Sequence, residues 1–195
     1  MSEMTIYDQK GKRLYLDKKE VEEFLVCARK QNTDYQTFAE ILVYTGCRIS
    51  EALNLTAENI KINENEITFN SLKKRKDSVY RDVPVPPSFM ATLKVAHQLV
   101  KKQKSKKLSN ALIWTWTRQH ANTIIKSIMK EAGIVEGKHR TPKGLRHAYG
   151  VNAIKNDIPL NMLRKWMGHA DMKTTAIYAN AIGKEEAEIA SKMWN

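Results

Sequence analysis

Four short segments of the chain carry side chains that could act together on a phosphate group. They are "TGCRISEAL" at 45–53, "SLKKRKD" at 71–77, "TPKGLRHAYG" at 141–150 and "WMGHADMKTTAIYA" at 166–179. Arginine is permanently charged and can grip phosphate through paired N–H donors. A tyrosine phenol can form a covalent intermediate. Together these side chains indicate chemistry at a phosphate ester.

The charge of the whole chain also indicates a phosphate-rich partner. Its 195 residues contain 33 Lys and Arg against 21 Asp and Glu, which gives a net charge of +12. Such an excess is typical of proteins that bind nucleic acid. Membrane binding is the competing explanation, but no apolar run approaches the roughly 18 residues that a spanning helix needs. The start, "MSEMTIYDQKGKRLYL", lacks the apolar core of a signal peptide, so we expect a cytoplasmic protein without a membrane partner.

Neither a metal site nor a disulfide is predicted. Cys27 and Cys47 are the only cysteines, and they form no CxxC or Cys/His pattern. Two-metal nucleases collect carboxylates around paired cations, whereas the acidic residues here are scattered along the chain. We therefore expect no cofactor.

Start signals, stop signals and apolar periodicity predict a mainly α-helical chain. Asp17 and Glu20 have the spacing of a capping box, Thr117 and Thr141 are candidate N-caps, and Gly46 is a candidate helix stop. The expected helices cover 17–30, 34–46, 48–55, 88–102, 118–132, one beginning at Pro142, 159–167, one opened by Asp171 that carries Tyr178, and 184–194.

Between Ile60 and Pro87 the pattern changes to short runs rich in Val and Tyr. We expect a small antiparallel β-sheet of about three strands there, with the basic turn "KKRKD" between the last two strands. The stretch "KKQKSKKLSN" at 101–110 is interpreted as a polar basic connector. The fold class is therefore α+β, mainly α with a small sheet.

In this order and with these spacings, the four segments resemble the catalytic domain of the tyrosine recombinases, also called the phage integrase family. The most specific features are "TGxRxSE" around Arg48, "GLRH" around Arg146, "GH" at His169, and Tyr178 nine residues later. The resemblance spans residues 17–183. It implies site-specific DNA cleavage and rejoining, as in integration, excision or inversion, through a 3′-phosphotyrosine intermediate and without a metal.

The resemblance also implies roles for individual side chains. Arg48 and Arg146 would stabilise the negative charge that develops on the phosphate oxygens, and His169 would donate to the same phosphate. Tyr178 would be the nucleophile. Glu51, one turn beyond Arg48, would orient neighbouring groups.

A lysine on the turn between two strands would protonate the leaving 5′ oxygen. Lys73 is the preferred candidate because it follows "SL" directly after the strand, Lys74 is the second candidate, and Lys76 is less favoured.

One position departs from the commonest family pattern, which has histidine three residues before Arg146. Lys143 stands there. An ammonium group with a pKa near 10.4 can stabilise phosphate charge but is a poor base at neutral pH, so the acceptor of the Tyr178 proton stays open. His147 is expected to point elsewhere on its helix and to have a structural role.

The expected organisation is a single catalytic domain over residues 1–195. Most relatives carry a helical DNA-clamping domain before the catalytic one, and we expect it to be absent here because only 47 residues precede Arg48. The chain is then either a short form similar to the fimbrial-switch invertases or an isolated catalytic domain. Residues 184–195, with an apolar stripe, would be exchanged between protomers, since recombinases assemble four subunits on double-stranded DNA.

Two alternative functions are open from the sequence. The first is a DNA-relaxing enzyme similar to type IB topoisomerases, which uses related chemistry. The second is a noncatalytic DNA-binding regulator that kept the fold. The target DNA sequence is not encoded in these motifs, because base readout depends on other side chains and on DNA shape.

Overall fold

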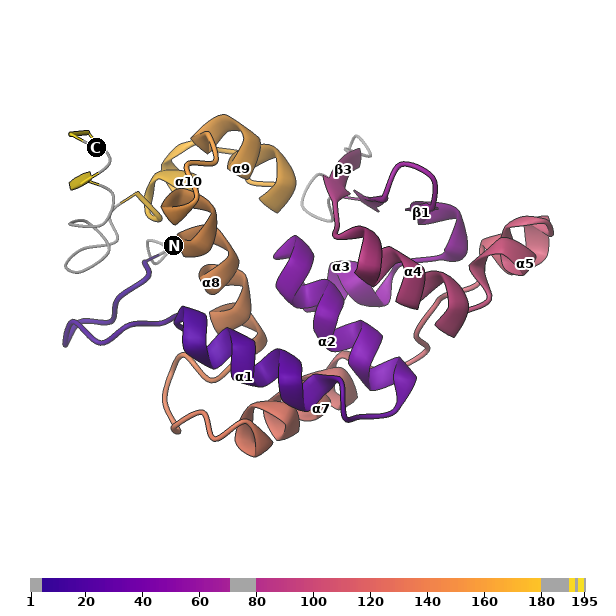
Figure 1. Ribbon diagram of the computed structural model, residues 1–195, viewed down its shortest axis with the longest axis horizontal. Helices are drawn as coiled ribbons and strands as arrows, with labels where there is room; N and C mark the ends of the chain where they lie inside the picture. Colours follow the sequence, from indigo (N-terminus) through magenta and orange to yellow (C-terminus); the bar gives the residue numbers. More distant parts are fainter. Residues whose placement is uncertain (1–4, 71–79, 180–189, 192, 195) are drawn as a thin grey trace.

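The protein is a mainly α-helical molecule with one small sheet, as the sequence predicts (Figure 1). The computed structural model describes residues 5–70, 80–179, 190–191 and 193–194. The helices are α1 (Lys18–Ala28), α2 (Thr33–Thr45), α3 (Ile49–Leu53), η1 (Ala57–Asn59), α4 (Pro87–Ala96), α5 (Leu99–Gln103), α6 (Lys106–Ser109), α7 (Arg118–Glu131), α8 (Pro142–Lys155), α9 (Leu160–Met167) and α10 (Lys173–Ala176).

The predicted helix starts are confirmed by hydrogen bonds at the caps. The Asp17 carboxylate accepts from the Glu20 amide at 2.9 Å, and the Glu20 carboxylate accepts from the Asp17 amide at 3.0 Å. The hydroxyls of Thr117 and Thr141 cap α7 and α8 by accepting from the amides of His120 and Gly144, and Pro142 lies in the first turn of α8. These local bonds satisfy N–H groups that have no partner inside the helix.

The sheet contains three antiparallel strands in the order β1-β2-β3: β1 (Ile60–Lys61), β2 (Glu66–Asn70) and β3 (Tyr80–Pro84). Ile67 pairs with Val83, and Phe69 pairs with Arg81. Because alternate residues of a strand face opposite sides, the apolar side chains and Arg81 all lie on the covered face. The predicted sheet is therefore confirmed. Its last connection, residues 71–79, lies outside the described residues.

The prediction of one continuous helix over 88–102 is wrong. The segment divides into α4 and α5 because Gln98 adopts a left-handed conformation with φ of 50°. Buried His97 lies 2.9 Å from the Thr37 hydroxyl of α2, and the Gln103 amide donates to the carbonyls of Ala57 and Ile60. These long-range bonds decide where the chain turns.

Two other expectations need correction. The presumed connector at 101–110 contains the end of α5 and the short helix α6. Asp171 does accept a hydrogen bond from the Lys173 amide at 3.0 Å, but α10 ends at Ala176. Tyr178 therefore lies in a turn just beyond the helix, with its amide bonded to the Thr175 carbonyl.

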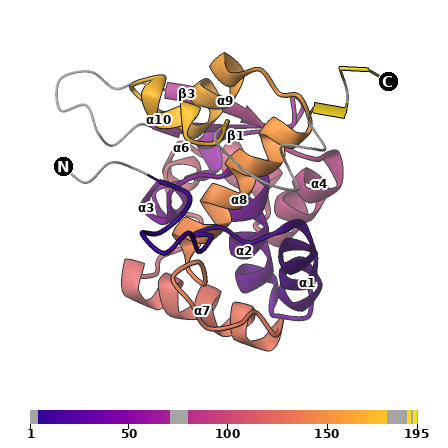
Figure 2. The same cartoon turned by 90° about the vertical axis from the view of Figure 1, so that its left-hand side faces the viewer.

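The core is centred on α2, which packs against α1, α4 and α8. Figure 2 shows α8 and α2 crossing the middle of the molecule, with α7 below and the sheet and α9 above. Trp114 fills the space beside Phe38, with ring centroids 5.1 Å apart. Large buried apolar side chains come from every part of this core, namely Phe24, Phe38, Ile41, Leu42, Phe69, Leu93, Trp114, Ile125 and Leu145.

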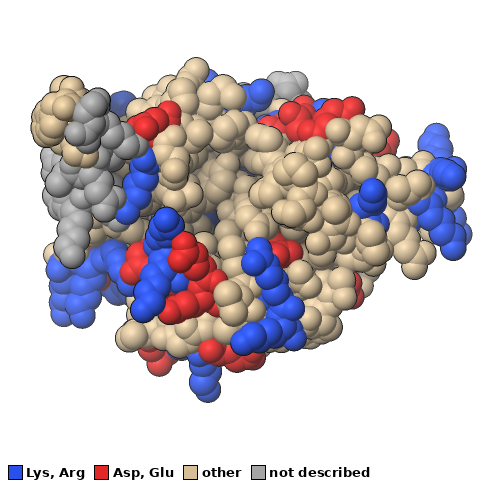
Figure 3. Space-filling view, viewed as in Figure 1, with Lys and Arg blue, Asp and Glu red and all other residues tan. Residues whose placement is uncertain are grey.

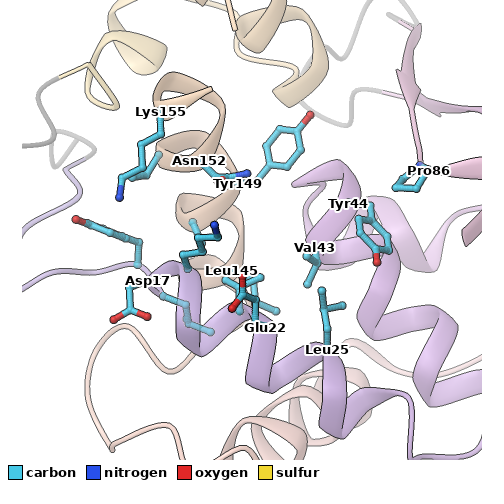
Figure 4. A pocket seen from close by; sticks show the side chains of 16 residues that line it. Asp17, Glu22, Leu25, Val43, Tyr44, Pro86, Leu145, Tyr149, Asn152 and Lys155 are labelled. Carbon is cyan, nitrogen blue, oxygen red and sulfur yellow. The ribbon is translucent and has the colours of Figure 1, made fainter. Parts of the chain in front are cut away.

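A cavity of about 380 Å³ opens between α1, α2 and α8. Its walls are mainly apolar, including Leu25, Val43 and Leu145, with Asp17 and Lys155 at its edge (Figure 4). On the face drawn in Figure 3, basic side chains gather over α5 and are mixed with acidic ones over α1. No helix in the described ranges is long and apolar enough to cross a membrane.

Candidate active site

Arg146 joins the ends of two helices that are distant in sequence. It lies on the buried face of α8 with 4% of its surface exposed. Its Nη1 donates to the Gly46 carbonyl at 2.5 Å, and its Nη2 donates to the Met167 carbonyl at 2.7 Å. The last carbonyls of a helix lack intrahelical partners and carry partial negative charge, so a guanidinium group stabilises them. Arg146 thereby holds the C-terminal ends of α2 and α9 together.

Two glycines make this junction possible. Gly46 ends α2 with φ of 57°, and Gly168 ends α9 with φ of 63°. A Cβ atom at Gly46 would lie 2.5 Å from Cδ1 of Tyr149 on α8, so a larger residue would separate α2 from α8. These left-handed ends turn the chain sharply, and Arg48 and His169 follow within two residues of them.

Glu51 binds two arginines inside the protein. Its carboxylate accepts from the Arg48 amide at 2.7 Å, from Arg48 Nη1 at 3.0 Å and from Arg81 Nη2 at 2.8 Å. Burial opposes ionisation of this carboxyl, but the charges and hydrogen bonds of Arg81 and Arg48 outweigh burial and lower the pKa of Glu51. Glu51 is therefore an ionised anchor that orients both guanidinium groups.

Arg81 is a member of this network that the sequence interpretation missed. It lies on β3 with 5% of its surface exposed, its Nε donates to the Trp166 carbonyl at 2.7 Å, and its guanidinium lies over the Phe69 ring at 5.0 Å. The signal was present in the sequence: Arg81 alternates with Val83 and Val85, so it occupies the apolar face of the strand.

His169 and Tyr178 lie face to face next to this junction. Their rings are stacked with centroids 6.2 Å apart and planes 11° from parallel. His169 follows the glycine end of α9, and its Nδ1 lies 3.0 Å from the Thr175 hydroxyl. Its Nε2 is buried and has no hydrogen-bond partner among the residues that the structure describes. A phosphate oxygen could satisfy this nitrogen.

His147 corrects one expectation. It was predicted to point away from the site, but its Nδ1 lies 3.1 Å from the Tyr178 hydroxyl, and neither residue is exposed. The reason is that position 147 lies on the face of α8 that also carries buried Gly150 and Val151. The hydrogen bond to Tyr178 therefore places His147 at the site.

Burial controls the protonation of the site. It raises the pKa of Tyr178 to about 12, against the opposing charges of Arg146 and Arg48. Burial lowers the pKa of His169 to about 3, with Arg146 and Arg48 acting in the same direction. Burial also lowers the pKa of His147 to about 4, aided by Lys143 and Arg146. At neutral pH the phenol is protonated and both imidazoles are neutral.

Protein stability is expected to fall on acidification because of these two histidines. Their folded-state pKa values lie below the unfolded value of about 6.5, so below that pH the unfolded chain takes up more protons. The loss between pH 7 and pH 5 is about 2 kcal/mol per histidine. Urea unfolding at both pH values checks this. His169→Gln should reduce the loss by about 2 kcal/mol. An undiminished loss in His169→Gln would contradict the assignment.

A hollow of roughly 900 Å³ lies beside the buried network and is strongly basic. Its lining includes the five cationic residues Arg48, Arg118, Lys138, Lys143 and Arg146. Neither Tyr178 nor His169 is among the described residues that line it. The hollow is therefore complementary to an anionic ligand.

Of the predicted site residues, Arg48, Glu51, Arg146, His169 and Tyr178 belong to one continuous cluster, and Lys143 lines the hollow next to it. Lys73, Lys74 and Lys76 lie outside the described residues, as does most of the predicted helix at 184–194. Within the described ranges, no three His, Cys, Asp or Glu side chains form a group that could hold a metal ion.

Comparisons with solved structures identify the class of this fold. The structure of XerH recombinase bound to its difH substrate after cleavage matches with a TM-score of 0.74 and 22% identity, covering 98% of this chain and 57% of that chain. The catalytic domain of bacteriophage HP1 integrase matches with a TM-score of 0.65 and 21% identity, covering 92% of this chain and 94% of that chain. The fold is that of a tyrosine recombinase catalytic domain.

Sequence comparisons agree with this class. The family model described as the phage integrase family matches residues 14–185, and the chain belongs to that family. Tyrosine recombinase XerA of Pyrococcus furiosus is 25% identical over 188 residues, covering 91% of this chain and 60% of that protein. The chain spans about 60% of the length of the curated relatives it matches.

Proposed function

We propose that the protein is a site-specific DNA recombinase that cleaves and rejoins DNA through a 3′-phosphotyrosine intermediate. The convergence of Arg48, Arg146, His169 and Tyr178 carries this proposal. Arg146 lies on α8, and the other three lie just before α3, just after α9 and just after α10. Their types supply the cations, the hydrogen-bond donor and the nucleophile that attack on phosphorus requires.

In the proposed reaction, the Tyr178 oxygen attacks the scissile phosphorus, the phenol proton passes to water, and the bond to the 5′ oxygen breaks. The phosphate becomes linked to Tyr178, and the released 5′ oxygen takes a proton, for which Lys73 is the proposed donor. Arg48, Arg146 and His169 stabilise the charge on the phosphate oxygens, and Lys143 adds a further positive charge. Attack by the 5′ hydroxyl of a new strand then reverses the first step and completes the exchange.

Double-stranded DNA is the proposed partner. The basic hollow supports this, and the XerH structure reported above is a complex of a similar fold with its DNA substrate. We also propose that residues 1–195 act as a single catalytic domain, and that a homotetramer forms on DNA with residues 184–195 docked on neighbouring protomers. Met193 and Trp194 are 82% and 72% exposed, which leaves apolar surface available for such a contact.

Arg118 is expected to contribute to DNA affinity through phosphate. It is exposed, lines the hollow and lies at the first position of α7. Each phosphate contact contributes a slope of about −0.9 to a plot of log affinity against log salt concentration for duplex DNA. Arg118→Gln should make that slope less steep by about this amount, as measured by fluorescence anisotropy. Lys130→Gln, at the other end of the same helix and away from the hollow, should leave it unchanged.

The proposal is tested by searching for a covalent intermediate. Duplexes with a randomised segment are selected for binding, nicked, and incubated with the protein in EDTA. The proposal predicts a protein–DNA adduct that survives denaturation, with mass spectrometry locating the nucleotide on the Tyr178 peptide. Retained binding without an adduct on any selected duplex would overturn it and favour a noncatalytic DNA-binding regulator.

A further inference from the structure

The hydroxyl of Tyr178 faces the interior of the protein. Tyr178 has no exposed surface, and it is absent from the lining of the basic hollow. The hollow contains Arg48 and Arg146, the two cations that would hold a phosphate. In its present position the phenol oxygen is bonded to buried His147 and is not presented to the hollow. Attack on a phosphate held there requires the oxygen to leave this bond.

Three residues hold Tyr178 in this position. His147 Nδ1 forms the hydrogen bond to the hydroxyl at 3.1 Å. The ring packs against Gly150, where a Cβ atom would lie 2.6 Å from Cε1 of the ring. His169 stacks on the ring. Of these contacts, only the one with His147 engages the reactive oxygen.

The pKa values of His147 and Tyr178 favour a neutral hydrogen bond between them over proton transfer. Tyr178 retains its proton because burial raises its pKa to about 12. The His147 ring lies beside Arg146 and Lys143, and burial with these charges lowers its pKa to about 4. An imidazolium next to a phenolate is therefore strongly disfavoured in this arrangement. A neutral hydrogen bond that fixes the direction of the hydroxyl is favoured instead.

We propose that His147 is a positioning residue that holds the Tyr178 hydroxyl in a resting position, out of reach of the phosphate site. This inference rests on the proposed function, in which Tyr178 is the nucleophile. Attack then requires that the hydroxyl exchange its bond with His147 for the phosphate. While no phosphate is bound, this hydrogen bond keeps the Tyr178 hydroxyl from reacting.

The test measures exposure of Tyr178 in the free protein. Tetranitromethane nitrates accessible tyrosine rings, and peptide mass spectrometry quantifies nitration of Tyr178 relative to Tyr80, which is 60% exposed. The variant His147→Phe keeps a ring at this position but removes the nitrogen. It should raise the ratio by about five-fold, the size expected for the net loss of one hydrogen bond. His147→Asn, whose amide can reach the hydroxyl, should restore protection.

Replacing His97 by phenylalanine is the matched control, because His97 is also a buried histidine bonded to a hydroxyl but lies away from Tyr178. If His97→Phe exposes Tyr178 equally, the effect is general loosening and the proposal fails. If Tyr178 stays protected in folded His147→Phe, or His147→Asn does not restore protection, the proposal also fails. Should His147→Phe not fold, His147→Ala is measured with the same criteria.

Adduct formation on the selected nicked duplexes separates this inference from the proposed function. The wild-type protein tests the function, and His147→Phe should form the adduct several-fold faster with unchanged DNA affinity. Absence of the wild-type adduct overturns the function while the nitration result stands on its own. If the wild-type protein forms the adduct normally but His147→Phe forms it more slowly, only the proposed role of His147 is overturned.

Discussion

Replacing Tyr178 by phenylalanine is expected to abolish the covalent adduct and strand transfer while DNA binding persists. The variant lacks the only atom that forms the proposed bond to phosphorus. Removing a nucleophile costs an enzyme on the order of 10⁴-fold or more in rate. Affinity should change little because the phenol lies outside the basic hollow. Denaturing gels of the nicked-duplex reaction measure the adduct, and anisotropy measures binding.

The same substitution should leave the fold intact. It removes one hydrogen bond and leaves Nδ1 of His147 buried without its partner, which costs about 1–3 kcal/mol. Tyr149→Phe is the matched control. Tyr149 lies on α8, where burial raises its pKa to about 12. Tyr149→Phe should retain the adduct, and an adduct in Tyr178→Phe would contradict the nucleophile assignment.

Replacing Glu51 by glutamine is expected to cause the largest loss of stability among the site variants. The substitution keeps the size of the side chain but removes its charge, which leaves Arg81 buried without a counter-ion. The two side chains are 1% and 4% exposed. Breaking such a pair costs about 3–5 kcal/mol, because the remaining charge stays out of water. Urea unfolding followed by circular dichroism measures the loss.

Glu40→Gln provides the comparison for this prediction. Glu40 is 5% exposed at its side chain and pairs with Arg29, whose side chain is 51% exposed. Arg29 can return to water when its partner is lost, so we expect a loss of about 1 kcal/mol or less. Adding Arg81→Met to Glu51→Gln should recover part of the stability. Equal losses in Glu51→Gln and Glu40→Gln would show that the buried charge is not the cause.

The sequence predicts those parts of the fold that depend on neighbouring residues. The caps at Asp17 and Thr141 and the left-handed end at Gly46 are formed by bonds within a few positions, so their patterns are visible in the chain. The break at Gln98 was missed because it depends on contacts between distant segments. The bond from buried His97 to Thr37 joins residues 60 positions apart.

The same division applies to the candidate site. Arg48, Arg146, His169 and Tyr178 were predicted from motifs, and the structure brings them together. Arg81 and His147 were missed as members because their partners come from other elements. Arg81 meets Glu51 across 30 positions, and His147 meets Tyr178 across 31. Alternation along β3 marks Arg81 as inward-facing, but no local pattern identifies which acid it meets.

The bonds from Arg146 to Gly46 and Met167 also determine when the site can exist during synthesis of the chain. The contact with Gly46 spans 100 positions, and the contact with Met167 spans a further 21. Contacts between residues so far apart in the sequence form late in folding, because closing a long loop costs chain entropy before the contact can stabilise it. A chain emerging from the ribosome therefore has no assembled phosphate site until α9 has been made. The proposed cleavage site therefore arises only together with the complete tertiary structure.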